Sequence, residues 1–265
     1  MLRILDARTG EPVSAAPARR GLTRIEAYAS GLDLTALRVL LTADVLVRAL
    51  ELGGTPVWTI LTAPHRLAEL RAAATTLSIR PFEDGRDLAS GLGESQVLHV
   101  TGERDGAPGG GTVVAVAPVT WAGEPPGRAV TAPSDAPASD AALGALLSAD
   151  ADADSGALRL ALLSVPRRAP ASLDAEGLSE AARTLARWRR AVAGWARQPS
   201  RPVPEEVRTR LRAAWEDDLD LPGVLAVLRD VEQAPDIPDG ARFETYVYAD
   251  RLLALDLPRD LGSLG

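Results

Sequence analysis

The sequence predicts a protein in two parts, an α/β part with a parallel sheet in residues 1–165 and an all-helical bundle in residues 166–265. Two patterns support this prediction. Near the N-terminus, short apolar strands alternate with helices, which is the order that builds parallel sheets with right-handed crossovers. From about residue 172 onward, apolar residues recur with the period of an α-helix.

The first half of the α/β part contains strand and helix patterns in alternation. Residues 25–29 alternate apolar and polar side chains, as a half-buried strand does, and Gly53 with Gly54 supplies a helix stop. The predicted elements are, in order, a strand and turn within residues 1–23, a strand at 25–29 ending at Gly31, a helix over 37–49, a strand at 56–61 and a helix from 64 to about 76.

Two further strands are predicted at 97–100 and 112–116, with three glycines at 109–111 between them. Such glycines either cradle a phosphate through backbone N–H groups or form a loop between strands. Because neither a Lys-Ser/Thr pair nor a helix pattern follows them, the loop is the favoured interpretation. Residues 158–163 fit a strand or a buried helix equally well.

The connection to the bundle is rich in proline. Residues 122–139 have no apolar period and are predicted to form a loop or linker. Ser139 is predicted to cap a short helix that runs through Leu147.

Four amphipathic helices with short loops predict the bundle. The first carries an apolar stripe that includes Trp188, and the second begins with Pro204 in its first turn. Asp220 is predicted to cap the third, with Pro222 in its first turn, and the fourth spans about 241–255.

Composition excludes several kinds of chemistry. The chain has no Cys and no Lys, so disulfides, thiolate zinc sites, cysteine nucleophiles and Schiff bases are impossible. Only His65, expected at the surface, and His99 are available as imidazoles. We therefore expect no metal. The sequence shows no signal peptide and no membrane span, and we expect a cytoplasmic protein with no membrane partner.

Charge is unevenly distributed along the bundle. Residues 167–212 carry eleven Arg and five acidic residues, whereas residues 213–265 carry four Arg and twelve acidic residues. This asymmetry has two interpretations, a face that contacts nucleic acid or a solvated helix surface. The candidate contacts for RNA or an acidic partner are Arg183, Arg187, Arg190, Arg197, Arg208 and Arg212.

Five segments, in order, resemble the cysteinyl-tRNA synthetase family. They are residues 2–11, 24–31, 38–50, 158–174 (through Arg167 and Asp174) and 216–222. The resemblance implies a class I synthetase fold: a Rossmann-like (HUP-type) domain that activates an amino acid with ATP, followed by a helical domain that meets tRNA. The resemblance is poor from about residue 62 to 140.

The chemical signatures of that family are absent at the matching positions. Its His-x-Gly-His turn, which stabilises the triphosphate at a helix N-terminus, falls on Asp33, Leu34, Thr35 and Ala36. Its second signature needs two lysines and would fall near residues 131–138, and its first zinc-binding cysteine would fall near Tyr28. We therefore predict a degenerate synthetase domain without catalytic residues, cofactor or metal.

The sequence-based hypothesis is a catalytically inactive relative that binds tRNA, another RNA or a protein partner. Two alternatives stay open: an adenylate-forming ligase with a rebuilt site, acting on an amino acid or amine, and a structural subunit of a larger enzyme complex. A possible ligand pocket would be lined by Tyr28, Asp33, Thr35 and His99, with His99 at a strand end on the carboxyl edge of the sheet. The carboxylates at Glu216, Asp217, Asp218 and Asp220 are interpreted as helix caps.

Overall fold

The computed structural model describes residues 1–17, 21–84, 94–103, 109–122 and 155–262. Its centre is a parallel sheet with strand order β5-β4-β3-β6-β7. The strands are β3 (Leu22–Tyr28), β4 (Val57–Thr62), β5 (Glu83–Asp84), β6 (Glu94–Gly102) and β7 (Thr112–Val116). This arrangement confirms the predicted Rossmann-like α/β fold class.

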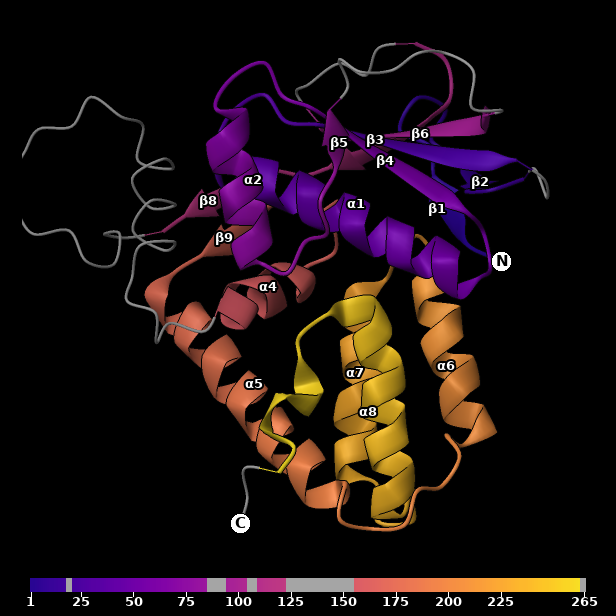
Figure 1. Cartoon of the computed structure of the whole chain (residues 1–265), viewed down its shortest axis with the longest axis vertical. Coiled ribbons are helices and arrows are strands. Elements are labelled where there is room, and N and C mark those ends of the chain that lie inside the picture. The colour runs from indigo at the N-terminus through magenta and orange to yellow at the C-terminus, as the bar shows by residue number, and fades with distance from the viewer. Residues whose placement is uncertain (18–20, 85–93, 104–108, 123–154, 263–265) are drawn as a thin grey trace, which may run out of the picture.

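Helices α1 (Leu34–Leu52) and α2 (Leu67–Thr76) connect the first three strands of this sheet. α1 crosses the molecule between the sheet and the C-terminal helices (Figure 1). Almost every α1 residue is buried because the helix packs on both layers, which explains an apolar sequence with little amphipathic contrast. α2 begins at Leu67 and not at residue 64, because Arg66 adopts a left-handed backbone with φ of 51°.

The C-terminal half is helical, as predicted. It contains α4 (Ser155–Leu163), α5 (Ala175–Trp195), α6 (Glu205–Glu216), α7 (Leu221–Gln233), α8 (Asp239–Leu253) and a 3₁₀ turn, η2 (Leu257–Asp260). Asp220 caps α7 through Gly223, and Trp188 is fully buried, both as expected. Residues 158–163 are helical, and they are buried all round, which is why periodicity alone did not distinguish strand from helix.

Two small strand pairs join distant parts of the chain. β1 (Arg3–Leu5) and β2 (Pro12–Ser14) form an antiparallel hairpin, whereas β8 (Val119–Trp121) pairs in parallel with β9 (Ala171–Leu173). The β8–β9 pair was not expected, because strands of three residues carry too few positions to show alternation. The predicted linker beyond residue 122 and the predicted helix at 139–147 lie outside the described residues.

The two halves share one continuous hydrophobic core, which includes side chains from α1, α4, α5 and α8. The N-terminal hairpin also reaches the bundle: the N–H of Leu5 donates to Asp218 at 2.7 Å, and the N–H of Asp218 donates to the carbonyl of Arg3 at 2.9 Å. Among the described residues, no helix has the length and apolar character needed to span a membrane.

Candidate functional site

The fold itself indicates one place for a ligand. From β3 the chain builds β4 and β5 on one side, then returns to place β6 and β7 on the other. Open α/β sheets bind ligands at such a switch point, in the crevice outside the carboxyl ends of the strands. Here that place lies beyond Tyr28 of β3 and Gly102 of β6, next to the start of α1.

The N-terminus of α1 is occupied by the chain's own groups. The Asp33 carboxylate accepts a hydrogen bond from the N–H of Ala36 at 2.7 Å and so caps the helix. Thr35 is engaged with β8: its hydroxyl accepts from the N–H of Val119 at 3.0 Å and lies 3.4 Å from the Val119 carbonyl. Leu34 and Ala36 are buried. The four positions that match the family's phosphate-binding turn therefore make a helix cap and a strand contact.

Tyr28 and His99, two of the four residues of the predicted pocket, lie close together. Their rings are 5.7 Å apart, and Glu26, directly opposite His99 in the sheet, has its carboxylate 3.5 Å from Nδ1 of that imidazole. Contact with His99 is the main reason why the pKa of Glu26 lies below its ordinary value. Burial, followed by hydrogen bonding with Glu26, raises the pKa of Tyr28. Tyr28, Glu26 and His99 belong to β3 and β6, whereas Asp33 caps α1 and Thr35 lies in its first turn.

His99 was expected at a strand end, but β6 continues for three residues beyond it. It is 3% exposed, and its Nε2 donates to the carbonyl of Gly110 at 2.8 Å. The glycine loop lies close against this strand: a Cβ on Gly111 would come within 2.7 Å of the Val97 carbonyl. His65 is exposed, as expected.

Buried arginines of this protein make structural contacts with its own backbone and side chains. Arg38, 2% exposed, donates to the backbone carbonyls of Val165, Pro166, Ala169 and Ala117. Burial lowers the pKa of this guanidinium to about 10. Arg38 therefore fastens α1 to the segment that leads into β9, and its donors face carbonyl oxygens of the protein.

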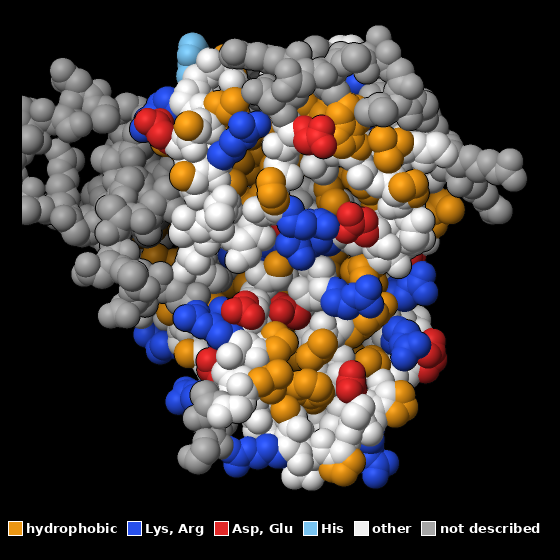
Figure 2. All heavy atoms as spheres, viewed as in Figure 1, with side chains coloured by type: hydrophobic (Ala, Val, Ile, Leu, Met, Phe, Trp, Pro, Cys, Tyr) orange, Lys and Arg blue, Asp and Glu red, His pale blue; other side chains and the backbone are white. Residues whose placement is uncertain are grey.

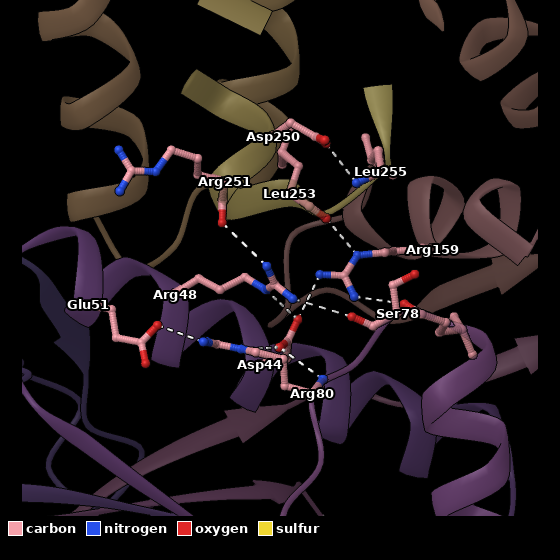
Figure 3. A network of polar contacts seen from close by, with 11 residues as sticks. Asp44, Arg48, Glu51, Ser78, Arg80, Arg159, Asp250, Arg251, Leu253 and Leu255 are labelled. Atoms are coloured by element: carbon pink, nitrogen blue, oxygen red, sulfur yellow. Dashed lines mark hydrogen bonds and ion pairs between the residues drawn. The ribbon is translucent and has the colours of Figure 1, made fainter. Parts of the chain in front are cut away.

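A second buried arginine lies at the junction of the halves. The Asp44 carboxylate on α1 accepts from Arg159 of α4 at 2.8 Å, from Arg48 at 2.9 Å and from Arg80 at 3.3 Å (Figure 3). Arg159 also donates to the carbonyl of Leu253 in α8 at 2.6 Å. The Asp44 and Arg159 side chains are fully buried. Burial alone would raise the pKa of Asp44, but Arg159 and Arg48 outweigh it and hold this pKa below its ordinary value.

Five of the six candidate contacts for RNA fall on two helices. Arg183, Arg187 and Arg190 belong to α5, Arg208 and Arg212 belong to α6, and Arg197 lies in the turn after α5. In Figure 1, α5 and α6 lie on either side of α7 and α8. The candidate residues on α5 are therefore separated from those on α6 by two intervening helices.

Most of these arginines have acidic neighbours. Arg187 pairs with Glu232 of α7 at 2.9 Å, Arg183 with Glu180 at 2.6 Å, and Arg212 with Glu216 at 3.2 Å. Arg208 lies 3.9 Å from Glu205, and Arg190 donates to a backbone carbonyl of its own helix. On the face drawn in Figure 2, basic and acidic side chains are interspersed over the helical half.

The carboxylates at 216–220 do more than cap helices. Asp220 caps α7 as predicted, but Asp218 accepts from Leu5 and forms an ion pair with the buried Arg167. Arg167 in turn donates to the carbonyl of Ala115 at 2.6 Å. These contacts join the N-terminal hairpin, the sheet and the bundle, and no local sequence signal indicates them.

The chemistry available at the switch point is limited. Among the described residues, no group of three or more His, Cys, Asp or Glu side chains is arranged to hold a metal. Tyr28, Glu26 and His99 provide hydrogen-bonding groups, and α1 presents a carboxylate at its start.

One curated protein is similar to part of this chain. It is the L-cysteine:1D-myo-inositol 2-amino-2-deoxy-alpha-D-glucopyranoside ligase of Streptosporangium roseum, 46% identical over 77 residues. The match covers 29% of this chain and 18% of that ligase, so it spans a small part of the relative. No protein-family model matches the chain. The similarity supports a relationship to cysteine ligases over that part of the sequence.

Proposed function

We propose that this protein is a catalytically inactive relative of the cysteine ligases and acts as a binding or regulatory module. The observation that carries the proposal is the start of α1, where the Asp33 carboxylate takes the N–H of Ala36. In a ligase that uses ATP, a helix N-terminus at this place is suited to a phosphate. Here a fixed negative charge of the protein takes that position and repels a triphosphate.

The nearby cations support the same conclusion. No lysine exists to hold phosphate as a point charge. Arg38, one turn into α1, is turned inward and satisfied by four carbonyls. Arg167 is likewise buried and pairs with Asp218. Of the described residues, Arg38 and Arg167 are therefore already engaged by the protein's own groups and are poorly placed to hold ATP.

The partner we favour is a protein and not RNA. RNA binding draws on arginines whose charge is free to neutralise phosphates. Arg183, Arg187 and Arg212 already face carboxylates of this chain. Those carboxylates lower the positive potential at both helix surfaces, so we expect weak RNA binding even at low ionic strength.

Amino-acid-dependent pyrophosphate exchange tests the loss of catalysis, with the Streptosporangium roseum ligase as positive control. We expect no exchange with any amino acid and no calorimetric binding of magnesium-ATP. Exchange with any amino acid would contradict the proposal. A salt-dependent titration with bulk tRNA tests the choice of partner, and tight binding that weakens steeply with salt would favour RNA instead.

A second candidate function is an adenylate-forming ligase with a rebuilt site, for an amino acid or amine. The favouring observation is the cluster of Tyr28, Glu26 and His99 at the switch point, where acid and base groups meet near the carboxyl end of β3. The same exchange assay separates the two functions. If the chain shows no exchange activity and co-purifies with a second protein in stoichiometric amount from the native host, the binding module is supported. The identity of that second protein then shows whether the chain is a subunit of a larger enzyme complex.

A further inference from the structure

A cavity of about 520 Å³ lies away from the switch point, at the β5 edge of the sheet. It is lined by residues of α2, by Leu61 near the end of β4 and by residues 79–83, which enter β5 at Glu83. Its apolar lining comes from Leu61, Ala74, Ile79 and Phe82, all of them buried. This volume is in the range of about 300–1,000 Å³ that is typical of small-molecule sites.

Two arginines, Arg71 and Arg80, line the same cavity. Arg71 of α2 forms no ion pair with the side chains that the structure describes, and its Nε lies in the interior, out of reach of solvent and without a hydrogen-bond acceptor. Its Nη2 donates to the Phe82 carbonyl at a long 3.5 Å. A hydrogen bond of this length is weak, so the Arg71 guanidinium can donate to a ligand oxygen in its place at little cost.

Arg80 contributes a second set of donors. Its Nη1 pairs with Glu51 at 2.7 Å and its Nε lies 3.3 Å from Asp44, so these contacts fix the guanidinium in place. These two contacts hold Arg80 in the cavity wall as a guanidinium of fixed position.

We propose that this cavity binds a small organic anion, with a carboxylate or phosphate held by Arg71 and Arg80 and an apolar group packed on Leu61, Ile79 and Phe82. Glu83 also lines the cavity and is exposed, and Asp44 and Glu51 offset part of the charge of Arg80. Because those two carboxylates offset Arg80, the positive charge available to a ligand is mainly that of Arg71, which favours a single negative charge on the ligand and disfavours a polyphosphate.

This site is independent of the proposed function. The cavity adjoins α2 and β5, whereas the switch point lies between β3 and β6, two strands away. The site needs no ATP and no acid or base. Figure 2 shows the face of the molecule that carries α2, where apolar side chains lie between a basic and an acidic group.

Isothermal titration calorimetry with hexanoate, hexyl phosphate and hexanol, in chloride buffer, tests the proposal. We expect saturable one-to-one binding of at least one of the two anions, and which one binds identifies the preferred headgroup. Hexanol should bind at least tenfold more weakly, because a charge-assisted contact to Arg71 is lost. Binding of hexanol as tight as that of the anions would overturn the proposal, as would no binding of either anion.

Three variants locate the binding. Arg71→Gln should weaken anion binding about tenfold or more, whereas Arg210→Gln, which removes an exposed arginine from α6, should leave it unchanged. Thr75→Trp places an indole at the exposed rim of the cavity and should abolish binding of both anions while far-UV circular dichroism stays unchanged. Equal affinities in all three variants would place the anion elsewhere and refute the site.

Discussion

Replacing Asp44 by Asn tests the contribution of a fully buried ion pair to stability. The Asp44 carboxylate and the Arg159 guanidinium are both fully buried and lie 2.8 Å apart. Removing one partner of such a pair leaves an uncompensated buried charge, which costs about 3–5 kcal/mol of folding free energy. For a chain of this size each kcal/mol lowers the melting temperature by about 2–4 °C. We expect a decrease of about 6–20 °C.

Thermal and urea unfolding, followed by circular dichroism, measure this effect. The matched control is Glu51→Gln, because the Glu51 side chain is 46% exposed and pairs with Arg80 of the same network. An exposed pair contributes only about 0–1 kcal/mol, so the control should change stability little. If Asp44→Asn loses no more stability than Glu51→Gln, water or another group compensates Arg159 and the reasoning is refuted.

The pH dependence gives a second, independent readout of the same residue. Arginine contacts hold the pKa of Asp44 below its ordinary 3.8. A lowered folded-state pKa contributes stability that is complete above the unfolded-state value and is lost as the pH falls through the folded-state value. The stability difference between wild type and Asp44→Asn should therefore be constant from about pH 5 to 8 and shrink only below about pH 4.

Three further substitutions have definite expected outcomes. Asp33→Ala removes the cap on Ala36 and should cost about 1 kcal/mol in urea unfolding without creating ATP binding, and ATP binding by this variant would show that the carboxylate alone blocks the site. Arg38→Met leaves four carbonyl oxygens without their donor and should lower the free energy of unfolding by at least about 3 kcal/mol. A decrease below about 1 kcal/mol would contradict the structural role of Arg38. Trp188→Phe loses the indole contact to Glu232 at 3.0 Å and should cost about 1–2 kcal/mol by thermal melting, and an unchanged melting temperature would contradict this.

The parts predicted well from the sequence are those with strong local signals. α7 is an example, since Asp220, Pro222 and a clear apolar stripe specify its start and its inward face. α1 was placed correctly because Gly53 and Gly54 end it and its apolar residues recur at helical spacing. Such signals need only neighbours along the chain.

The contacts at the candidate site could not be predicted in the same way. Arg187 counts as a basic residue in the sequence, but Glu232, 45 positions later on α7, neutralises it in space. Thr35 bonds with Val119, 84 positions away, in a strand of three residues. One missed signal was available: Arg159 interrupts an apolar run, and an arginine in such a place needs a buried carboxylate.

The hairpin at the N-terminus has a consequence for synthesis on the ribosome. Leu5 of this hairpin donates a hydrogen bond to Asp218, more than two hundred residues later in the chain. Arg159 likewise donates to the carbonyl of Leu253. Contacts between such distant positions form late, since a long loop must close before they are gained. We expect the nascent chain to stay incompletely folded until its last helices leave the exit tunnel, and therefore to depend on chaperones over most of its translation.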